Sequence, residues 1–145
     1  MKSLAPYLAL LSVTLILGGC NTLASAPEFR GAKISPDQLY PGDSALITVE
    51  VKDREAIIQR IEGVVKEDPR ITFKLRDDGV DPDEKAGDGI WTLRVDVPPV
   101  APSGEFLLEF TAYSSGGYPV EVHDANKNVV PLKDSLPIVI QYKEQ

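Results

Sequence analysis

The densest group of side chains that could do chemistry lies in one short acidic segment, residues 77–89. The segment contains five aspartates and one glutamate against a single lysine. Calcium in proteins takes six to eight oxygen ligands at about 2.3–2.6 Å, and clustered carboxylates supply several of them. The segment therefore predicts a calcium site, and its candidate ligands are Asp77, Asp78, Asp81, Asp83 and Asp88.

The same acids also fit a loop that hydrogen bonds alone hold in shape. The calcium loop of an EF-hand is not matched: Ala86 takes the place of its glycine when the count starts at Asp81, and Asp88 replaces its final glutamate when it starts at Asp77. Aspartates accept hydrogen bonds from nearby backbone N–H groups, and the dipeptide Asp88-Gly89 suits a tight turn. From the sequence, a structural loop, a cation site and a mixture of both remain open.

The remaining reactive side chains do not form a catalytic set. His123 is the only histidine, so a histidine-rich metal site is excluded and a serine triad would depend on this one residue. No serine stands in the Gly-x-Ser-x-Gly pattern of a nucleophile elbow. Trp91 and Tyr118 are candidates for an aromatic ligand platform, although a tryptophan at the head of a strand also suits the core. We therefore expect a protein that is not an enzyme.

The single cysteine, Cys20, follows an apolar stretch near the start of the chain. Leu4 to Leu17 is about 14 residues long, which is short for a membrane-spanning helix but typical of a signal peptide. It ends in Leu17-Gly18-Gly19-Cys20. This ending resembles the signal of bacterial lipoproteins, in which the chain is cut before the cysteine. The resemblance implies that Cys20 carries a diacylglycerol and an N-acyl chain such as palmitate.

The lipoprotein resemblance defines the expected segments and location. Residues 1–19 would be the signal peptide, residues 20–26 a lipidated tether, and residues 27–145 the folded domain. Asn21, rather than aspartate, follows the cysteine, which by the resemblance favours the outer membrane of the cell envelope and its periplasmic side. Several acyl chains give stable anchoring where one does not. Removal of residues 1–19 takes away only Lys2, so the net charge changes from -7 to -8. Such a charge argues against nucleic acid as a partner.

Upstream and downstream of the acidic segment, the chain is built of short alternating stretches separated by turns. Alternation of apolar and polar residues predicts strands, whereas no long window has helical periodicity. Proline, glycine and aspartate clusters mark the turns between them. The predicted strands cover residues 29–34, 44–51, 57–65, 70–75, 90–97, 105–113 and 136–142. Seven short strands in about 115 residues favour an antiparallel β-sandwich.

Two segments are ambiguous. Residues 55–67 contain good helix formers, but Gly63, Val64 and Val65 favour a strand, in which Ile57, Gln59 and Ile61 would share one face. Residues 118–132 form either a long loop or a hairpin. The hairpin would turn at residues 124–127, with valines 120 and 122 facing valine 129.

Three motifs resemble bacterial immunoglobulin-like domains. They are Leu39-Tyr40-Pro41-Gly42-Asp43-Ser44 before a strand, Ser103-Gly104-Glu105-Phe106 with the alternation that follows it, and the acidic loop leading into Trp91. The resemblance covers nearly all of residues 27–142, without the cysteine pair of antibody domains. It implies an all-β, immunoglobulin-like antiparallel sandwich of about seven strands.

Together these features predict a lipid-anchored envelope protein whose immunoglobulin-like domain is a non-enzymatic binding or assembly module. Its expected partners are the membrane and an envelope protein or glycan. Two alternatives are a calcium-stabilised carbohydrate-binding module and an accessory or inhibitor of an envelope hydrolase. Fold alone does not choose among them.

Overall fold

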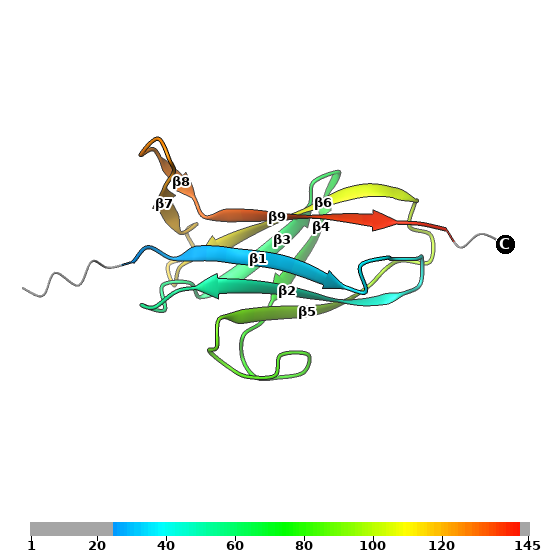
Figure 1. The fold of residues 1–145 in the computed structure, drawn as a ribbon, viewed down its shortest axis with the longest axis horizontal. Coiled ribbons are helices and arrows are strands. Elements are labelled where there is room, and N and C mark those ends of the chain that lie inside the picture. Colours follow the sequence, from blue (N-terminus) through cyan, green and yellow to red (C-terminus); the bar gives the residue numbers. More distant parts are fainter. Residues whose placement is uncertain (1–24, 143–145) are drawn as a thin grey trace, which may run out of the picture.

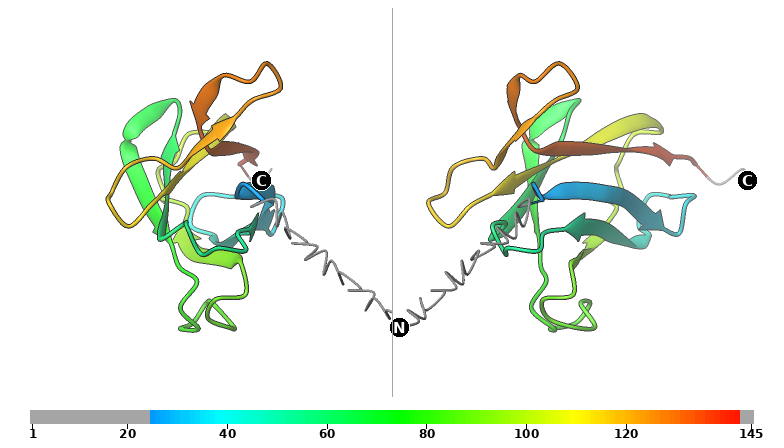
Figure 2. Two further views of the ribbon diagram at one scale, coloured as in Figure 1. Left: turned by 90° about the vertical axis from the view of Figure 1, so that its left-hand side faces the viewer. Right: turned by 60° about the vertical axis from the view of Figure 1, so that its left-hand side comes forward.

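Two antiparallel sheets face each other in the computed structural model, which describes residues 25–142 (Figures 1 and 2). The first sheet has the order β1 (Glu28–Ser35), β2 (Ser44–Lys52), β5 (Ile90–Asp96). The second has the order β4 (Asp68–Leu75), β3 (Arg60–Val65), β6 (Gly104–Tyr113), β9 (Lys133–Ile140). The predicted immunoglobulin-like sandwich is confirmed. Because β4 pairs with β3, the first sheet keeps three strands instead of the four of an antibody constant domain.

The core lies between the sheets and is built from the inward half of each alternating strand. Ile47 and Val49 of β2 face Ile61 and Phe110 of the second sheet, and all four side chains are at most 1% exposed. Complete burial of such a side chain contributes about 1.5–3 kcal/mol each. Phe110 also meets the ring of Phe73 edge-on, with centroids 5.9 Å apart. The apolar residues of the alternating strands therefore form one continuous layer between the two sheets.

The segment after β2 differs from the predicted strand 57–65. The chain turns at Ala56, whose φ is 52°, and the regular strand β3 begins only at Arg60. The carboxylate of Asp53 accepts a hydrogen bond from the backbone N–H of Ile58 at 2.7 Å. This turn buries Ile58 and leaves Ile57 36% exposed, so the prediction that Ile57 shares the face of the strand is wrong. The helical alternative for residues 55–67 is wrong as well.

The C-terminal part of the domain contains a hairpin and an earlier last strand than predicted. β7 (Glu121–His123) and β8 (Val129–Pro131) pair with each other and extend away from the sandwich (Figures 1 and 2). Val122 faces Val130 in the hairpin, so the predicted pairing with Val129 is off by one residue. β9 covers residues 133–140 instead of 136–142, and Pro137 is tolerated because β9 bonds to a neighbour on one side over most of its length.

The start of β1 fixes where the chain enters the sandwich. Pro27 is buried and Glu28 pairs with Lys52, the last residue of β2. The predicted start of the domain at residue 27 stays a prediction. The predicted signal peptide, Cys20 and most of the tether lie outside the described residues. Within residues 25–142, no helix long and apolar enough to cross a membrane is found.

Candidate functional site

The acidic segment forms the long loop between β4 and β5, at the bottom of Figure 1. A pair of backbone hydrogen bonds between Arg76 and Thr92, 2.8 and 2.9 Å long, closes its base. Gly89 turns the chain into β5 with a φ of 84°, and a Cβ atom there would lie 2.7 Å from the carbonyl oxygen of Val51. Only glycine fits both the backbone angle and this close approach.

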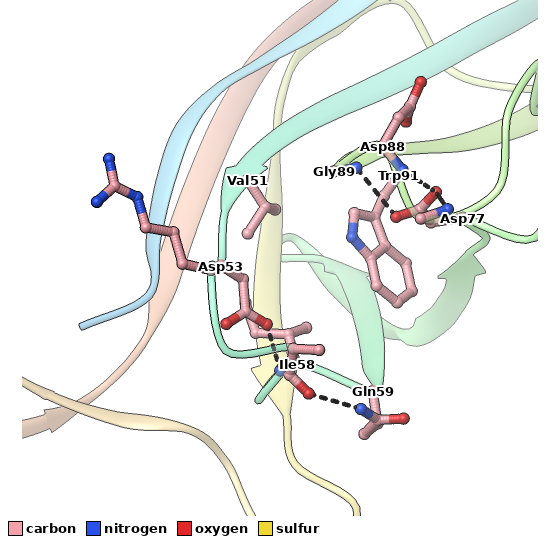
Figure 3. Close-up of a pocket in the computed structure, with 11 residues that line it drawn as sticks. Val51, Asp53, Ile58, Gln59, Asp77, Asp88, Gly89 and Trp91 are labelled. Carbon is pink, nitrogen blue, oxygen red and sulfur yellow. Dashed lines mark hydrogen bonds between the residues drawn. The ribbon is translucent and has the colours of Figure 1, made fainter. Parts of the chain in front are cut away.

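Asp77 is the residue that holds the two arms of this loop together. One of its carboxylate oxygens accepts hydrogen bonds from the N–H groups of Gly87 at 2.7 Å and Asp88 at 3.3 Å. The other accepts from the N–H of Gly89 at 3.2 Å, as Figure 3 shows beside Trp91. These bonds span ten to twelve residues of sequence. Hydrogen bonds from backbone N–H groups to an aspartate thus shape the loop, as expected for a loop that hydrogen bonds hold in place.

Three of the five predicted calcium ligands come together. One carboxylate oxygen from each of Asp77, Asp83 and Asp88 lies within 4.8 Å of the others. Asp83 is 4% exposed, and one of its oxygens accepts a hydrogen bond from the N–H of Gly79 at 2.5 Å. Several of the lone pairs that a cation would need are therefore used by the loop itself. Calcium binding at these three residues stays a prediction.

The other two predicted ligands point elsewhere. Asp78 forms an ion pair with Arg76, with an N–O distance of 2.6 Å, and Asp81 forms one with Arg94 of β5 at 2.9 Å. The hydrogen bond from the Arg76 side chain lowers the pKa of Asp78 below its ordinary value. In the structure, three of the five predicted ligands thus lie together, while the carboxylates of Asp78 and Asp81 pair with arginines that flank the loop.

A hollow of about 410 Å³ lies between this loop and the turn that follows β2. We call it the Trp91 hollow. Apolar, polar and charged residues line it, namely Val51, Asp53, Arg54, Ala56, Ile58, Gln59, Asp77, Gly87, Asp88, Gly89 and Trp91. In Figure 3, Trp91 lies between the Asp77–Gly89 side and the side that carries Asp53 and Ile58. Its volume is within the range of small-molecule sites.

Trp91 could be a core residue or a ligand-platform residue from the sequence, and in the structure it is in contact with both the core and the hollow. It is partly buried and packs against the main core, opposite Val49 of β2. It also lines the hollow, and its indole N–H has no acceptor among the described residues. Tyr118, in contrast, is 75% exposed and does not line the hollow. The two predicted platform residues therefore do not act on one ligand in this hollow.

The residues that sequence reasoning missed are on the turn after β2. Asp53 and Arg54 lie between two predicted strands, and Gln59 lies within the predicted strand 57–65. A gap between strands and a strand position do not by themselves indicate a binding site. The signal was the polar run Asp53-Arg54-Glu55 directly after the alternating strand β2, which is typical of a turn. That this turn meets the acidic loop follows only from the pairing of β2 with β5.

His123 lies away from the hollow, at the exposed end of β7. The neighbouring Asp124 shapes the β7–β8 turn by accepting hydrogen bonds from the N–H groups of Asn126 and Asn128. The N–H of Asn128 is the main cause that lowers the pKa of Asp124. The histidine is therefore the last residue of β7, paired with Val129 beside this turn.

Comparisons with known proteins find a likeness among solved structures. No protein-family model matches the chain. No curated protein matches it either. Among solved structures, it is similar to a Niemann-Pick type C2 protein from Japanese carpenter ant, with 12% sequence identity and a TM-score of 0.46. The likeness covers 81% of this chain and 95% of that one.

Proposed function

We propose that this protein is a bacterial envelope lipoprotein whose immunoglobulin-like domain is a non-enzymatic binding module, held at a membrane by acyl chains on Cys20. The observation that carries the proposal is the placement of the Trp91 hollow. It lies at the end of the sandwich where β1 begins, because Glu28 pairs with Lys52 and Trp91 pairs with Val49 on the same strand β2. The candidate site thus lies at the end of the sandwich to which the proposed anchor would be attached.

The length of the tether supports a domain that stays close to the membrane surface. Eight residue steps separate Cys20 from Glu28. A fully extended chain spans about 3.3–3.6 Å per residue, so the start of β1 lies at most about 29 Å from the lipidated residue. The opposite end of the sandwich, with Val100 between β5 and β6, is then farther from the bilayer by the length of the strands (Figure 1). The proposed anchor would therefore hold the end of the sandwich that carries the hollow closer to the bilayer than the opposite end.

The chemistry of the hollow supports binding in preference to catalysis. Asp53 and Asp77 accept hydrogen bonds from backbone N–H groups, so their carboxylates are used to hold loops in place. The one histidine lies on the distant hairpin. A rigid sandwich with a preformed hollow between two fixed loops can bind a ligand with little ordering of its own side chains.

Three measurements test this function. Mass spectrometry of the purified chain should find Cys20 as the acylated N-terminal residue, and a Cys20→Ser variant should leave the membrane fraction. Crosslinking in intact envelopes should recover a partner with the wild-type chain. A partner that is lost in a Trp91→Phe, Asp53→Asn double variant, and kept in an Asp37→Asn control, would assign the hollow as the binding site. An unmodified Cys20 together with a soluble chain would refute the anchor.

A further inference from the structure

The β7–β8 hairpin has one side that is exposed and partly apolar. Val122 packs against the main core, whereas the residues before and after it in β7 are exposed. In β8 the exposed positions are Val129, which is 57% exposed, and Pro131. They pair with His123 and Glu121 of β7. Because side chains alternate along a strand, these four residues share the side of the hairpin that points away from the core.

An exposed tyrosine precedes this hairpin. Tyr118 is 75% exposed, and its phenol hydroxyl has no partner among residues 25–142. The hydroxyl of Tyr142, at the opposite end of the domain, instead donates to the backbone carbonyl oxygen of Ala101 at 3.1 Å. An aromatic ring with a free hydroxyl beside aliphatic side chains suits a membrane–water interface, where the hydroxyl stays hydrated. We call Tyr118, Val129 and Pro131 the hairpin surface.

The hairpin surface lies at the end of the sandwich where β1 begins (Figures 1 and 2). The backbone N–H of Val120 donates to the carbonyl oxygen of Ala112 at 2.8 Å, so the hairpin starts from the C-terminal end of β6. This end of β6 pairs with Arg60 at the start of β3, which follows the turn after β2. β2 in turn ends beside Glu28 of β1. The proposed anchor would therefore be attached at the end that carries the hairpin surface.

The charges of the hairpin segment are balanced. Residues 118–133 contain two acids, Glu121 and Asp124, and two lysines, Lys127 and Lys133. The net charge of -8 expected for the mature chain therefore comes from other parts of it. Cytoplasmic and envelope membranes commonly carry anionic lipids, which repel acidic surfaces within about one Debye length. A neutral, partly apolar segment can contact such a bilayer without this repulsion.

We propose that the hairpin surface rests on the lipid bilayer as a second contact beside the acyl chains, and that it thereby fixes the orientation of the domain. The inference rests on the proposed function, since the tether of eight residue steps between Cys20 and Glu28 keeps this end near the membrane. Docking of a tethered domain is an intramolecular event with an effective concentration on the order of mM. A contact too weak to hold a free domain is then sufficient.

A tryptophan moved onto the hairpin tests this contact. Trp91 is the only tryptophan of the chain, so a Trp91→Phe, Val129→Trp variant reports the hairpin alone. The matched control is Trp91→Phe, Val139→Trp, because Val139 is also exposed but pairs with Glu105 near the opposite end. Each mature lipidated chain is placed in phosphatidylcholine vesicles with and without lipid that is brominated on its acyl chains. Bromine quenches tryptophan only on close contact. We expect the hairpin tryptophan to lose about half of its emission or more, and the control to lose little.

Hydrogen exchange tests the unmodified hairpin, since a new tryptophan itself favours the interface. In vesicles, the amides of β7 and β8 should exchange about tenfold more slowly in the wild type than in a Tyr118→Ser, Val129→Thr variant, which corresponds to docking for about nine-tenths of the time. In detergent this difference should shrink to the intrinsic effect of the substitutions. A Val100→Thr, Val139→Thr variant should exchange in vesicles as the wild type does. Equal quenching at positions 129 and 139, or a wild-type hairpin that exchanges as fast as the polar variant, would overturn the proposal.

Mass spectrometry of the same preparations separates this failure from that of the anchor. An acylated Cys20 without lipid contact at position 129 would overturn the inference and leave the anchor intact. If Cys20 is not acylated, the anchor fails. The thiol of this only cysteine is then coupled to a maleimide lipid, and both measurements are repeated. Quenching and slow exchange at the hairpin in that form would support the lipid-binding surface itself, and their absence would overturn it.

Discussion

Removal of the Asp77 carboxylate should open the loop beside Trp91. In an Asp77→Ala variant, the N–H groups of Gly87, Asp88 and Gly89 lose their acceptor. A hydrogen bond to a charged group contributes about 1.5–3 kcal/mol when it is shielded from water. Two of these three are longer than 3.1 Å, and water reaches the loop, so we expect a total loss of about 2 kcal/mol.

A thermal melt followed by circular dichroism measures this loss. For a domain of this size, about 2 kcal/mol lowers Tm by about 8 °C. Asp77→Asn keeps one acceptor oxygen and should give about half of the shift. The matched control is Asp81→Ala in the same loop, which removes only an exposed ion pair with Arg94 and should cost less than about 1 kcal/mol. Equal shifts in Asp77→Ala and Asp81→Ala would refute the role of Asp77.

The same melt distinguishes a hydrogen-bonded loop from one that needs a cation. If hydrogen bonds suffice, Tm is the same with calcium and with a chelator. A cation held by the three converging acids would instead raise the Tm of the wild type by RT ln(1 + [L]/Kd), and the increase would vanish in an Asp83→Asn, Asp88→Asn double variant. An increase that persists in that double variant would place the cation elsewhere.

Three further predictions concern other parts of the chain. Gly63→Ala places a Cβ atom 2.1 Å from the ring of Phe73 and should destabilise the domain by about 2 kcal/mol in a urea titration. The lowered pKa of Asp124 means that its ionised form stabilises the β7–β8 turn; the contribution is complete above about pH 5 and is lost as pH falls through the lowered pKa. Amide NMR of Asn128 against pH should show this opening, and an unchanged signal down to pH ~2 would contradict it. Cys20→Ser should move the chain from the membrane to the soluble fraction.

The strands could be predicted because each carries its own pattern. In β2 and β6 the buried and partly exposed residues alternate along the strand, as the apolar pattern of the sequence does. Where a turn determines which residue is buried, the apolar pattern of the sequence does not identify that residue. Ile57 and Ile58 are equally apolar, and only the bend at Ala56 with the Asp53 cap determines that Ile58 is the buried one. The start of β3 therefore could not be located from periodicity.

The candidate site was predictable in its composition and not in its geometry. The acids of residues 77–89 are visible in the sequence, but Asp78 and Asp81 are drawn into ion pairs with arginines that lie before and after the loop. The Trp91 hollow joins residues 51–59 to residues 77–91, and these two segments meet only because β5 pairs with β2. Asp53 and Arg54 become site residues through that pairing.

The most direct test of the central claim asks which end of the sandwich faces the lipid. The mature lipidated chain is placed in vesicles that contain a headgroup-labelled nitroxide lipid, which quenches nearby tryptophan. A second chain carries Trp91→Phe and Val100→Trp, since Val100 is 87% exposed at the opposite end. We expect stronger quenching of Trp91 than of the tryptophan at position 100. Equal quenching, or stronger quenching at position 100, would contradict a binding hollow that opens toward the membrane.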